Sequence, residues 1–346
     1  MPRERWPATP KSVEFTYSFD RPLRSIATCY ISESCAPIKC SGIPTYTLLF
    51  AGGISLNQET WVPVIKHLYR IAADPEVNFD ILSIWVIERP NHGDSALLNK
   101  RILDNHYSEV FPGVQYATCI QHFLCSNILS PRERESLIAV GHSSGAGCLF
   151  RAMYPAMNHF PFKAVVAVEC PHCGTEAEEW FQLLYKNVIR SSARRPRDWA
   201  SKEDAMEWMK THLPWSTFHP DVLAIIEETY FITAPDKPGR IAPKTSVEQE
   251  QACFVHDGIY KMGVPYIRQI LSRIPVHVIS GSVEDIWPRQ MYRIVEKNLK
   301  EDRDAFASVV TIQGASHYVP VQKPQELATE IARILANESR VPPARL

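Results

Sequence analysis

The sequence has almost no net charge. Its 346 residues include 37 Lys and Arg against 38 Asp and Glu, which leaves a formal charge of -1 at pH 7. A nucleic-acid-binding surface needs an excess of positive charge, so this balance gives no support for DNA or RNA as a partner. With 45% hydrophobic and 22% charged residues, the composition is that of a globular protein that can bury a large core.

The sequence also lacks long apolar runs. No stretch approaches the length that crosses a bilayer, and residues 1–6 do not have the pattern of a secretory signal. The 9 cysteines are odd in number and scattered along the chain, and a core of this size does not need disulfides. We therefore expect a reducing, intracellular location.

One short motif stands out at residues 141–145. Gly141, His142, Ser143, Ser144 and Gly145 form the pattern G-x-S-x-G between an apolar run of strand type and a run of small residues that opens a helix. This context is typical of a nucleophile elbow, in which a strand turns sharply into a helix and holds a serine hydroxyl at the end of a sheet. Glycine at both flanking positions lets the two backbone segments pass close together. We predict that Ser143 is a catalytic nucleophile.

A histidine near the end of the chain is the candidate base. His317 lies in a loop after the last predicted strand and before Pro320 and a final helix. The chain order serine, acid, histidine is the order of the serine hydrolases that use a nucleophile elbow. His317 would take the proton of Ser143, and a carboxylate would hold its imidazole in the required tautomer.

Three carboxylates are candidates for that acid. Glu284 and Asp285 lie in the loop after the strand predicted at 276–280, which is the usual position. Glu169 ends the strand predicted at 162–168, where some hydrolases place their acid. Both loops face the same end of a parallel sheet. The sequence leaves the choice among the three open.

Backbone amides for an oxyanion hole are predicted at two places. Ser144 follows the nucleophile at a helix N-terminus, which favours negative charge. Gly53 and Ile54 lie in a glycine-rich loop after the strand predicted at 46–50, and the amide of Ile54 would complete the hole. Gly52 stands where a histidine is usual.

The remaining patterns predict one α/β domain with an inserted segment. Strands are predicted at 13–18, 25–32, 46–50, 80–87, 136–140, 162–168, 276–280 and 307–312, and helices at 114–129 and 324–335. Between 174 and 263 strand signals mostly vanish and the pattern becomes helical and amphipathic. We predict a mostly parallel sheet flanked by helices from residues 1–170 and 264–340, a helical lid at 171–263, and a flexible tail at 341–346.

Two further groups have a functional and a structural interpretation. Cys170 and Cys173 form a C-x-x-C pair that could be a redox motif, although no thioredoxin-like context frames it. A zinc site would need more ligands than the nearby His172, and we expect no metal and no cofactor. His92 lies in a loop that shapes the top of the sheet, so we expect a structural role for it.

A group of arginines lies within the predicted lid. Its members are Arg190, Arg194, Arg195 and Arg197. Such a group is usually a solvated face, but it could instead bind the phosphates of a coenzyme A substrate.

The last three residues are Ala344, Arg345 and Leu346. They fit the small-basic-Leu tripeptide that addresses proteins to the peroxisome. We expect a peroxisomal import receptor as a partner, with a cytoplasmic location as the alternative.

These motifs together resemble a known group over nearly the whole chain, the fungal α/β-hydrolases of secondary-metabolite pathways, especially those for host-selective toxins. The likeness lies in residues 51–56 with Glu59 and Trp61, in 88–95, in 141–145 and in 195–199. More distantly, the chain is similar to the peroxisomal acyl-CoA hydrolase of mycophenolic acid biosynthesis. That family places its acid after the strand that follows the elbow, which corresponds to Glu169. Gly52 in place of His, and Glu in place of Asp at 169, depart from the family pattern.

The residues and the resemblance together predict an α/β-hydrolase fold and a serine hydrolase. A serine at position 143, where epoxide hydrolases and dehalogenases of this fold carry aspartate, favours an acyl substrate such as an ester or thioester. The resemblance implies a fatty-acyl or polyketide-like group, including a coenzyme A thioester. The alternatives are a non-catalytic binding protein of the same fold and a thiol redox protein that uses Cys170 and Cys173.

Overall fold

A computed structural model describes residues 8–32, 42–154, 160–254 and 263–338. Its main sheet contains the strands β1 (Ala8–Ser18), β2 (Pro22–Ser32), β3 (Thr45–Ala51), β4 (Asp80–Ile87), β5 (Leu137–His142), β6 (Ala164–Val168), β9 (Val276–Gly281) and β10 (Ser308–Ile312). They are ordered β1-β2-β4-β3-β5-β6-β9-β10. The pairs β1–β2 and β2–β4 are antiparallel, and all the others are parallel. The predicted α/β class and mostly parallel sheet are confirmed.

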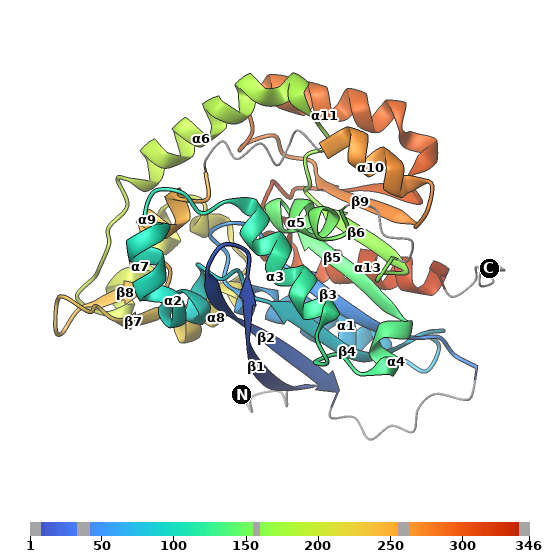
Figure 1. The fold of residues 1–346 in the computed structure, drawn as a ribbon, viewed down its shortest axis with the longest axis horizontal. Helices are drawn as coiled ribbons and strands as arrows, with labels where there is room; N and C mark the ends of the chain where they lie inside the picture. The colour runs from blue at the N-terminus through green and yellow to red at the C-terminus, as the bar shows by residue number, and fades with distance from the viewer. Residues whose placement is uncertain (1–7, 33–41, 155–159, 255–262, 339–346) are drawn as a thin grey trace.

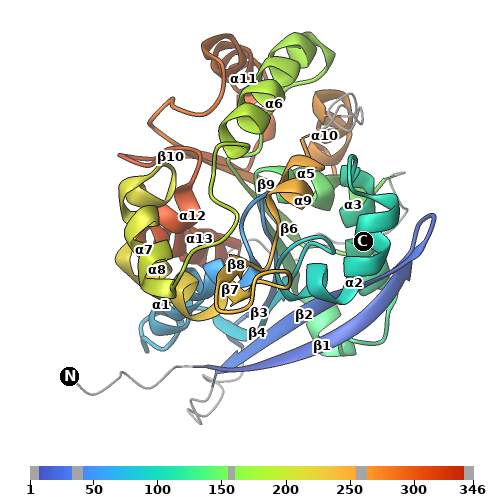
Figure 2. The ribbon, with the colours of Figure 1, turned by 90° about the vertical axis from the view of Figure 1, so that its left-hand side faces the viewer.

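The helices flank this sheet on both faces (Figures 1 and 2). Their bounds are α1 (Val62–Ala72), α2 (Gly93–His106), α3 (Gly113–Cys125), α4 (Pro131–Glu135), α5 (Ser144–Ala152), α6 (Glu178–Ser192), α7 (Lys202–Thr211), α8 (Pro220–Thr229), α9 (Val247–Gln251), α10 (Gly263–Leu271), α11 (Arg289–Glu301), α12 (Val319–Gln322) and α13 (Pro324–Glu338). None of these described helices is long and apolar enough to cross a membrane.

The central strands are buried on both faces, which explains their unbroken apolar runs. All six residues of β5 are buried. One apolar cluster joins one face of the sheet to α3 and α5, and a second joins the other face to α1 and α13. Strand β1 alternates instead, because only one side of it packs on the core, whereas residues 27–30 of β2, which pair with β4, are all buried.

The elements between β6 and β9 lie over the carboxyl ends of the parallel strands. Helix α6 runs beside α11 (Figure 1), and Phe181 and Leu184 pack with Met291 and Val295 between them. This segment also contains two three-residue strands, β7 (Phe231–Thr233) and β8 (Ile241–Pro243), which pair antiparallel. The sequence did not predict them because three residues are too few to show a period of two. The predicted tail at 341–346 lies outside the described residues.

Candidate active site

Ser143 lies at the sharp turn between β5 and α5. Its φ of 53° and ψ of -126° are a strained conformation for a residue with a side chain. A Cβ atom at Gly145 would lie 2.4 Å from the backbone oxygen of Ala51, and one at Gly141 would lie 2.4 Å from Ala146 Cα. The two glycines therefore permit the close backbone approach that holds the turn, as the motif predicts.

Three side chains from separate loops meet at this turn. Ser143 Oγ lies 2.9 Å from His317 Nε2, and His317 Nδ1 lies 3.1 Å from Glu169 Oε2. A carboxylate only accepts hydrogen bonds, so Nδ1 carries the ring proton and Nε2 is free to accept from the serine hydroxyl. This is the geometry of a nucleophile, a base and an orienting acid.

The three candidate acids have different surroundings. Glu169 is buried at the end of β6, with its second oxygen accepting a hydrogen bond of 2.5 Å from the amide of Gly281. Glu284 and Asp285 are exposed. Among the described carboxylates, the one that contacts His317 is thus Glu169. The last residue of β9, Gly281, thus contributes a backbone amide that fixes this acid.

The side chain of His142 forms a hydrogen bond with the loop that contains His317. Its Nε2 donates a hydrogen bond of 2.8 Å to the backbone oxygen of His317. Burial, aided by the nearby His317, lowers the pKa of His142 to about 3, so its ring stays neutral at physiological pH. The sequence motif predicts no role for His142 beyond its position beside Ser143.

The predicted oxyanion loop passes close to the nucleophile. A Cβ atom at Gly53 would lie 2.7 Å from His142 Nδ1 and 3.3 Å from Ser143 Cβ, so this position has no room for a larger residue. Ile54 lines the same cavity as Ser143 and Ser144. The loop continues to Ser55, whose φ of 70° requires support from its neighbours.

His92 and Glu250 supply that support. His92 Nε2 accepts a hydrogen bond of 2.9 Å from the amide of Ser55, and its Nδ1 donates to Asn91 Oδ1 at 2.9 Å. Burial lowers the pKa of His92 well below its ordinary value, which keeps the ring neutral. Ser55 Oγ donates to Glu250 Oε2 at 2.8 Å. His92 thus has the structural surroundings that the sequence led us to expect.

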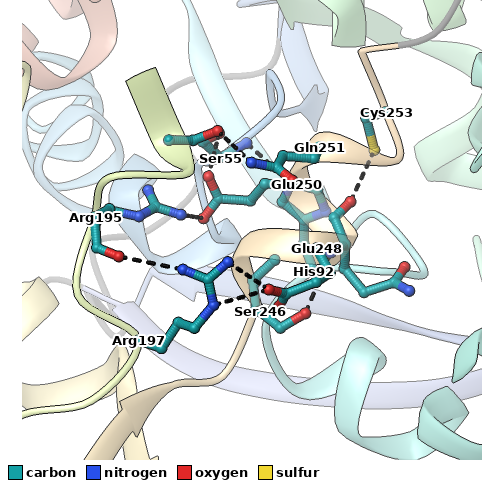
Figure 3. Close-up of polar contacts among 12 residues, drawn as sticks. Ser55, His92, Arg195, Arg197, Ser246, Glu248, Glu250, Gln251 and Cys253 are labelled. Atoms are coloured by element: carbon teal, nitrogen blue, oxygen red, sulfur yellow. Dashed lines mark hydrogen bonds and ion pairs between the residues drawn. The ribbon is translucent and has the colours of Figure 1, made fainter. Parts of the chain in front are cut away.

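The arginine group does not form one surface. Arg195 is buried and lies 2.8 Å from Glu250, whereas Arg197 is exposed and lies 2.9 Å from Glu248 (Figure 3). Arg190 and Arg194 are exposed. Two of the four guanidiniums are therefore already paired with carboxylates, and this argues against the group as a single phosphate clamp.

We expect Glu250→Gln to lower the free energy of unfolding by about 3–5 kcal/mol, because it leaves the guanidinium of Arg195 buried without its partner. Glu248→Gln is the matched control in the neighbouring pair. Side chains of Arg197 and Glu248 are 51% and 52% exposed, and the loss there should be below about 1 kcal/mol. Urea unfolding of both variants measures the difference. Equal losses of unfolding free energy in the two variants would show that the buried pair stabilises the protein no more than the exposed pair does.

A further buried carboxyl group directly follows β4, at the start of the loop that contains His92. Glu88 is 1% exposed, and its Oε2 accepts a hydrogen bond of 2.7 Å from the amide of Ser95. Burial and the nearby Glu59 raise the pKa of Glu88 well above its ordinary value of 4.5. Burial also raises the pKa of Glu59.

These raised pKa values make stability depend on pH. Above pH 4.5 the folded protein holds protons that the unfolded chain releases, so the free energy of unfolding falls as pH rises toward the folded-state pKa. Glu88→Gln should flatten this fall. Urea unfolding at pH 5 and pH 8 measures this fall, and the exposed Glu296→Gln is the control. If the free energy of unfolding of Glu88→Gln fell as much between the two pH values as that of the wild type, the raised pKa of Glu88 would be refuted as the cause.

A cavity of about 220 Å³ opens beside Ser143 and His317. Its wall is mainly apolar and includes Phe111, Phe181, Leu184, Tyr185, Ile267 and Trp287. Phe181, Leu184 and Tyr185 come from one face of α6 at helical spacing. Trp199, Trp208 and Trp215, which the sequence places in the same segment, pack on one another instead.

Cys170 and Cys173 also line this cavity as free thiols. Burial raises the pKa of Cys170 to about 12 and raises that of Cys173 further. A redox-active cysteine needs a lowered pKa, so these surroundings oppose the redox alternative. In the described part of the chain, no group of three or more His, Cys, Asp or Glu residues could hold a metal.

Comparison with known proteins adds the family context. The sequence matches the model of the Alpha/beta hydrolase family over residues 48–330. The peroxisomal membrane protein LPX1 of Saccharomyces cerevisiae is 20% identical over an alignment of 297 positions that covers 80% of this chain and 71% of the relative. The solved structure of peroxisomal alpha-beta-hydrolase Lpx1 from the same yeast has a TM-score of 0.73 and 18% identity, covering 98% of this chain and 93% of that one.

Two other solved structures are similar. E-2-(acetamidomethylene)succinate hydrolase has a TM-score of 0.64 and 19% identity, covering 93% of this chain and 98% of its own. The thioesterase domain from the curacin biosynthetic pathway has a TM-score of 0.59 and 14% identity, covering 93% and 99%. At these identities the likeness is one of fold, and it confirms the predicted α/β-hydrolase fold. The toxin and mycophenolic-acid links stay predictions from the sequence.

Proposed function

This chain is a hydrolase that belongs to the alpha/beta hydrolase family, and from that premise we propose that it cleaves esters or thioesters with Ser143, His317 and Glu169. The observation that carries the proposal is the chain of two contacts, 2.9 Å from Ser143 Oγ to His317 Nε2 and 3.1 Å from His317 Nδ1 to Glu169 Oε2. Glu284 and Asp285 have no part in it.

The reaction would proceed in two halves. His317 takes the proton of Ser143 as Oγ attacks the acyl carbon, and Glu169 stabilises the imidazolium that forms. The amides of Ser144 and Ile54 would hold the oxyanion, with Gly53 allowing the close approach. The imidazolium then protonates the leaving alcohol or thiol. Water, activated by His317, releases the acid from the acyl-enzyme.

The substrate would carry an apolar acyl group. The cavity beside Ser143 is lined by aromatic and aliphatic side chains, several of them from α6. We propose that residues 171–263 act as a lid that covers this group and excludes water. A fatty-acyl or polyketide-like chain fits such a wall. A coenzyme A thioester is a prediction from the arginine group and the sequence resemblance, and a role in toxin biosynthesis is a prediction from the resemblance alone.

A panel of acyl-CoA thioesters and matched oxygen esters tests the substrate class. Release of free thiol and of free acid is measured for chains of increasing length, and a serine-directed fluorophosphonate is applied in parallel with peptide mapping. The proposal expects turnover of at least one class and covalent labelling at Ser143. Turnover of oxygen esters alone would discard the thioester. A folded protein with neither turnover nor labelling would favour the non-catalytic binding protein.

We also propose a peroxisomal location. The yeast relative is described as peroxisomal, and the tripeptide 344–346, which lies outside the described residues, fits the address. A fluorescent protein fused to the N-terminus should colocalise with a peroxisomal marker and lose that pattern when residues 344–346 are removed. A diffuse signal from the intact fusion would favour the cytoplasm.

A further inference from the structure

The cavity wall contains a buried guanidinium that the triad does not use. Arg89 follows β4, is 4% exposed, and lines the cavity together with Ser143 and Ser144. Its Nε has no hydrogen-bond partner in the described residues. The thiols of Cys253 and Cys148 and the phenol of Tyr116 lie near its charge, and the Cys148 thiol also makes a hydrogen bond with it.

Two further contacts hold this guanidinium in place. Its Nη2 donates a hydrogen bond of 2.7 Å to Ser144 Oγ, and its Cζ lies 4.5 Å from the centre of the Tyr116 ring. Tyr116 is itself fixed by a hydrogen bond of 2.6 Å from its hydroxyl to the backbone oxygen of Ile87. Neither contact neutralises the charge, because a serine hydroxyl and an aromatic ring carry no formal negative charge.

The rest of the wall, as far as the described residues form it, does not supply a counter-ion. Among the described residues that line the cavity, the charged ones are Arg89 and Arg151, and no Asp, Glu or Lys lines it. Elsewhere in the described chain the buried arginine beside the oxyanion loop, Arg195, does have a carboxylate partner in Glu250. A buried charge without an opposite charge is costly, so proteins keep one mainly where a ligand completes the pair.

We propose that Arg89 binds a carboxylate of the substrate, so that the preferred substrates are esters or thioesters of acids that carry a second, ionised carboxyl group. The proposal rests on the proposed function, since it names the substrate of the same site. A planar guanidinium fixed by a ring and a hydroxyl is pre-organised for a carboxylate. One buried guanidinium in a mainly apolar wall suits that single charge better than the several phosphates of a nucleotide.

Matched half-esters provide the test. Monoethyl esters of C4 to C8 α,ω-dicarboxylic acids are compared with the same esters whose free carboxyl is converted to an amide. Wild-type kcat/KM should favour the acid over the amide at the best chain length by about 10- to 100-fold, the range expected for a hydrogen bond to a charged group. Arg89→Gln should bring this acid-to-amide ratio close to one, and Arg89→Lys should reduce it less.

Ser144→Ala is the matched control for a merely structural role. It removes the hydroxyl that Arg89 contacts and leaves the guanidinium, so the acid-to-amide ratio should persist. If Ser144→Ala lowers the ratio as far as Arg89→Gln does, Arg89 acts through Ser144 and the proposal fails. If Arg89→Gln does not fold, the acid-to-amide ratio of Arg89→Lys is compared with that of the wild type instead.

Calorimetry tests whether Arg89 binds a carboxylate independently of whether the protein cleaves esters. Ser143→Ala protein is titrated with the half-esters and with the amides, which measures recognition without turnover. Tighter binding of the half-esters, lost in the Ser143→Ala/Arg89→Gln double variant, supports the carboxylate site even if no ester is cleaved. Turnover without any acid preference, and equal binding of acid and amide, would keep the triad and overturn the assignment of Arg89.

Discussion

Ser143→Ala is expected to lower kcat by about 10⁶-fold, because among the described hydroxyls only that of Ser143 contacts the base His317. The free energy of unfolding should stay within about 1 kcal/mol of the wild-type value, since alanine keeps the Cβ atom and loses only the contact with His317 Nε2. Ser143→Gly should be more stable than Ser143→Ala by about 1 kcal/mol, because glycine accepts the φ of 53° without strain.

Pre-steady-state ester hydrolysis and urea unfolding measure the two effects. Exposed Ser272→Ala serves as the control for a hydroxyl remote from the site. Substantial turnover by folded Ser143→Ala protein would show that the nucleophile lies elsewhere and would remove the basis of the triad.

Glu169→Gln should have the second-largest effect, a fall in kcat of about 10⁴-fold. One oxygen of Glu169 accepts from Gly281 N and the other from His317 Nδ1. A glutamine has a single oxygen acceptor, so it cannot satisfy both donors. Its NH₂ group facing the ring would favour the tautomer with a proton on Nε2, which cannot accept the proton of Ser143.

Asp285→Asn and Glu284→Gln are the matched controls, because both carboxylates are exposed in the loop where the acid is usually found. Each should retain far more activity than Glu169→Gln, with KM and kcat determined for the same ester. The assignment is wrong if Asp285→Asn causes the larger fall.

The sequence predicted the sheet, the nucleophile Ser143 and the base His317, because these depend on local patterns. Apolar runs predicted β3, β4 and β5, and the glycines on either side of Ser143 predicted the elbow. The acid could not be chosen in this way. Glu169 and Asp285 follow neighbouring strands, and only the side-chain direction at the end of β6 brings Glu169 to His317.

Other features depend on contacts between distant segments. Arg195 and Arg197 are two residues apart, yet one is buried against Glu250 and the other is exposed beside Glu248 (Figure 3). The pattern at 88–95 pointed to His92 and predicted no role for Arg89. An arginine two residues after a buried strand, at the sheet edge where the nucleophile is expected, is the signal that identifies it.

The pairing of β6 with β9 has a consequence for how this protein can change over evolutionary time. Val165 on β6 lies beside Val276 on β9, and the whole segment with α6 to α10 connects them. The entropy lost in closing a chain loop grows only with the logarithm of its length, by about 0.6 kcal/mol for each doubling. Insertions and deletions in this connection therefore cost the sheet little, provided that they keep the packing of α6 on α11. New pocket walls, and so new substrates, can arise there while the strands that hold Ser143, Glu169 and His317 keep their register.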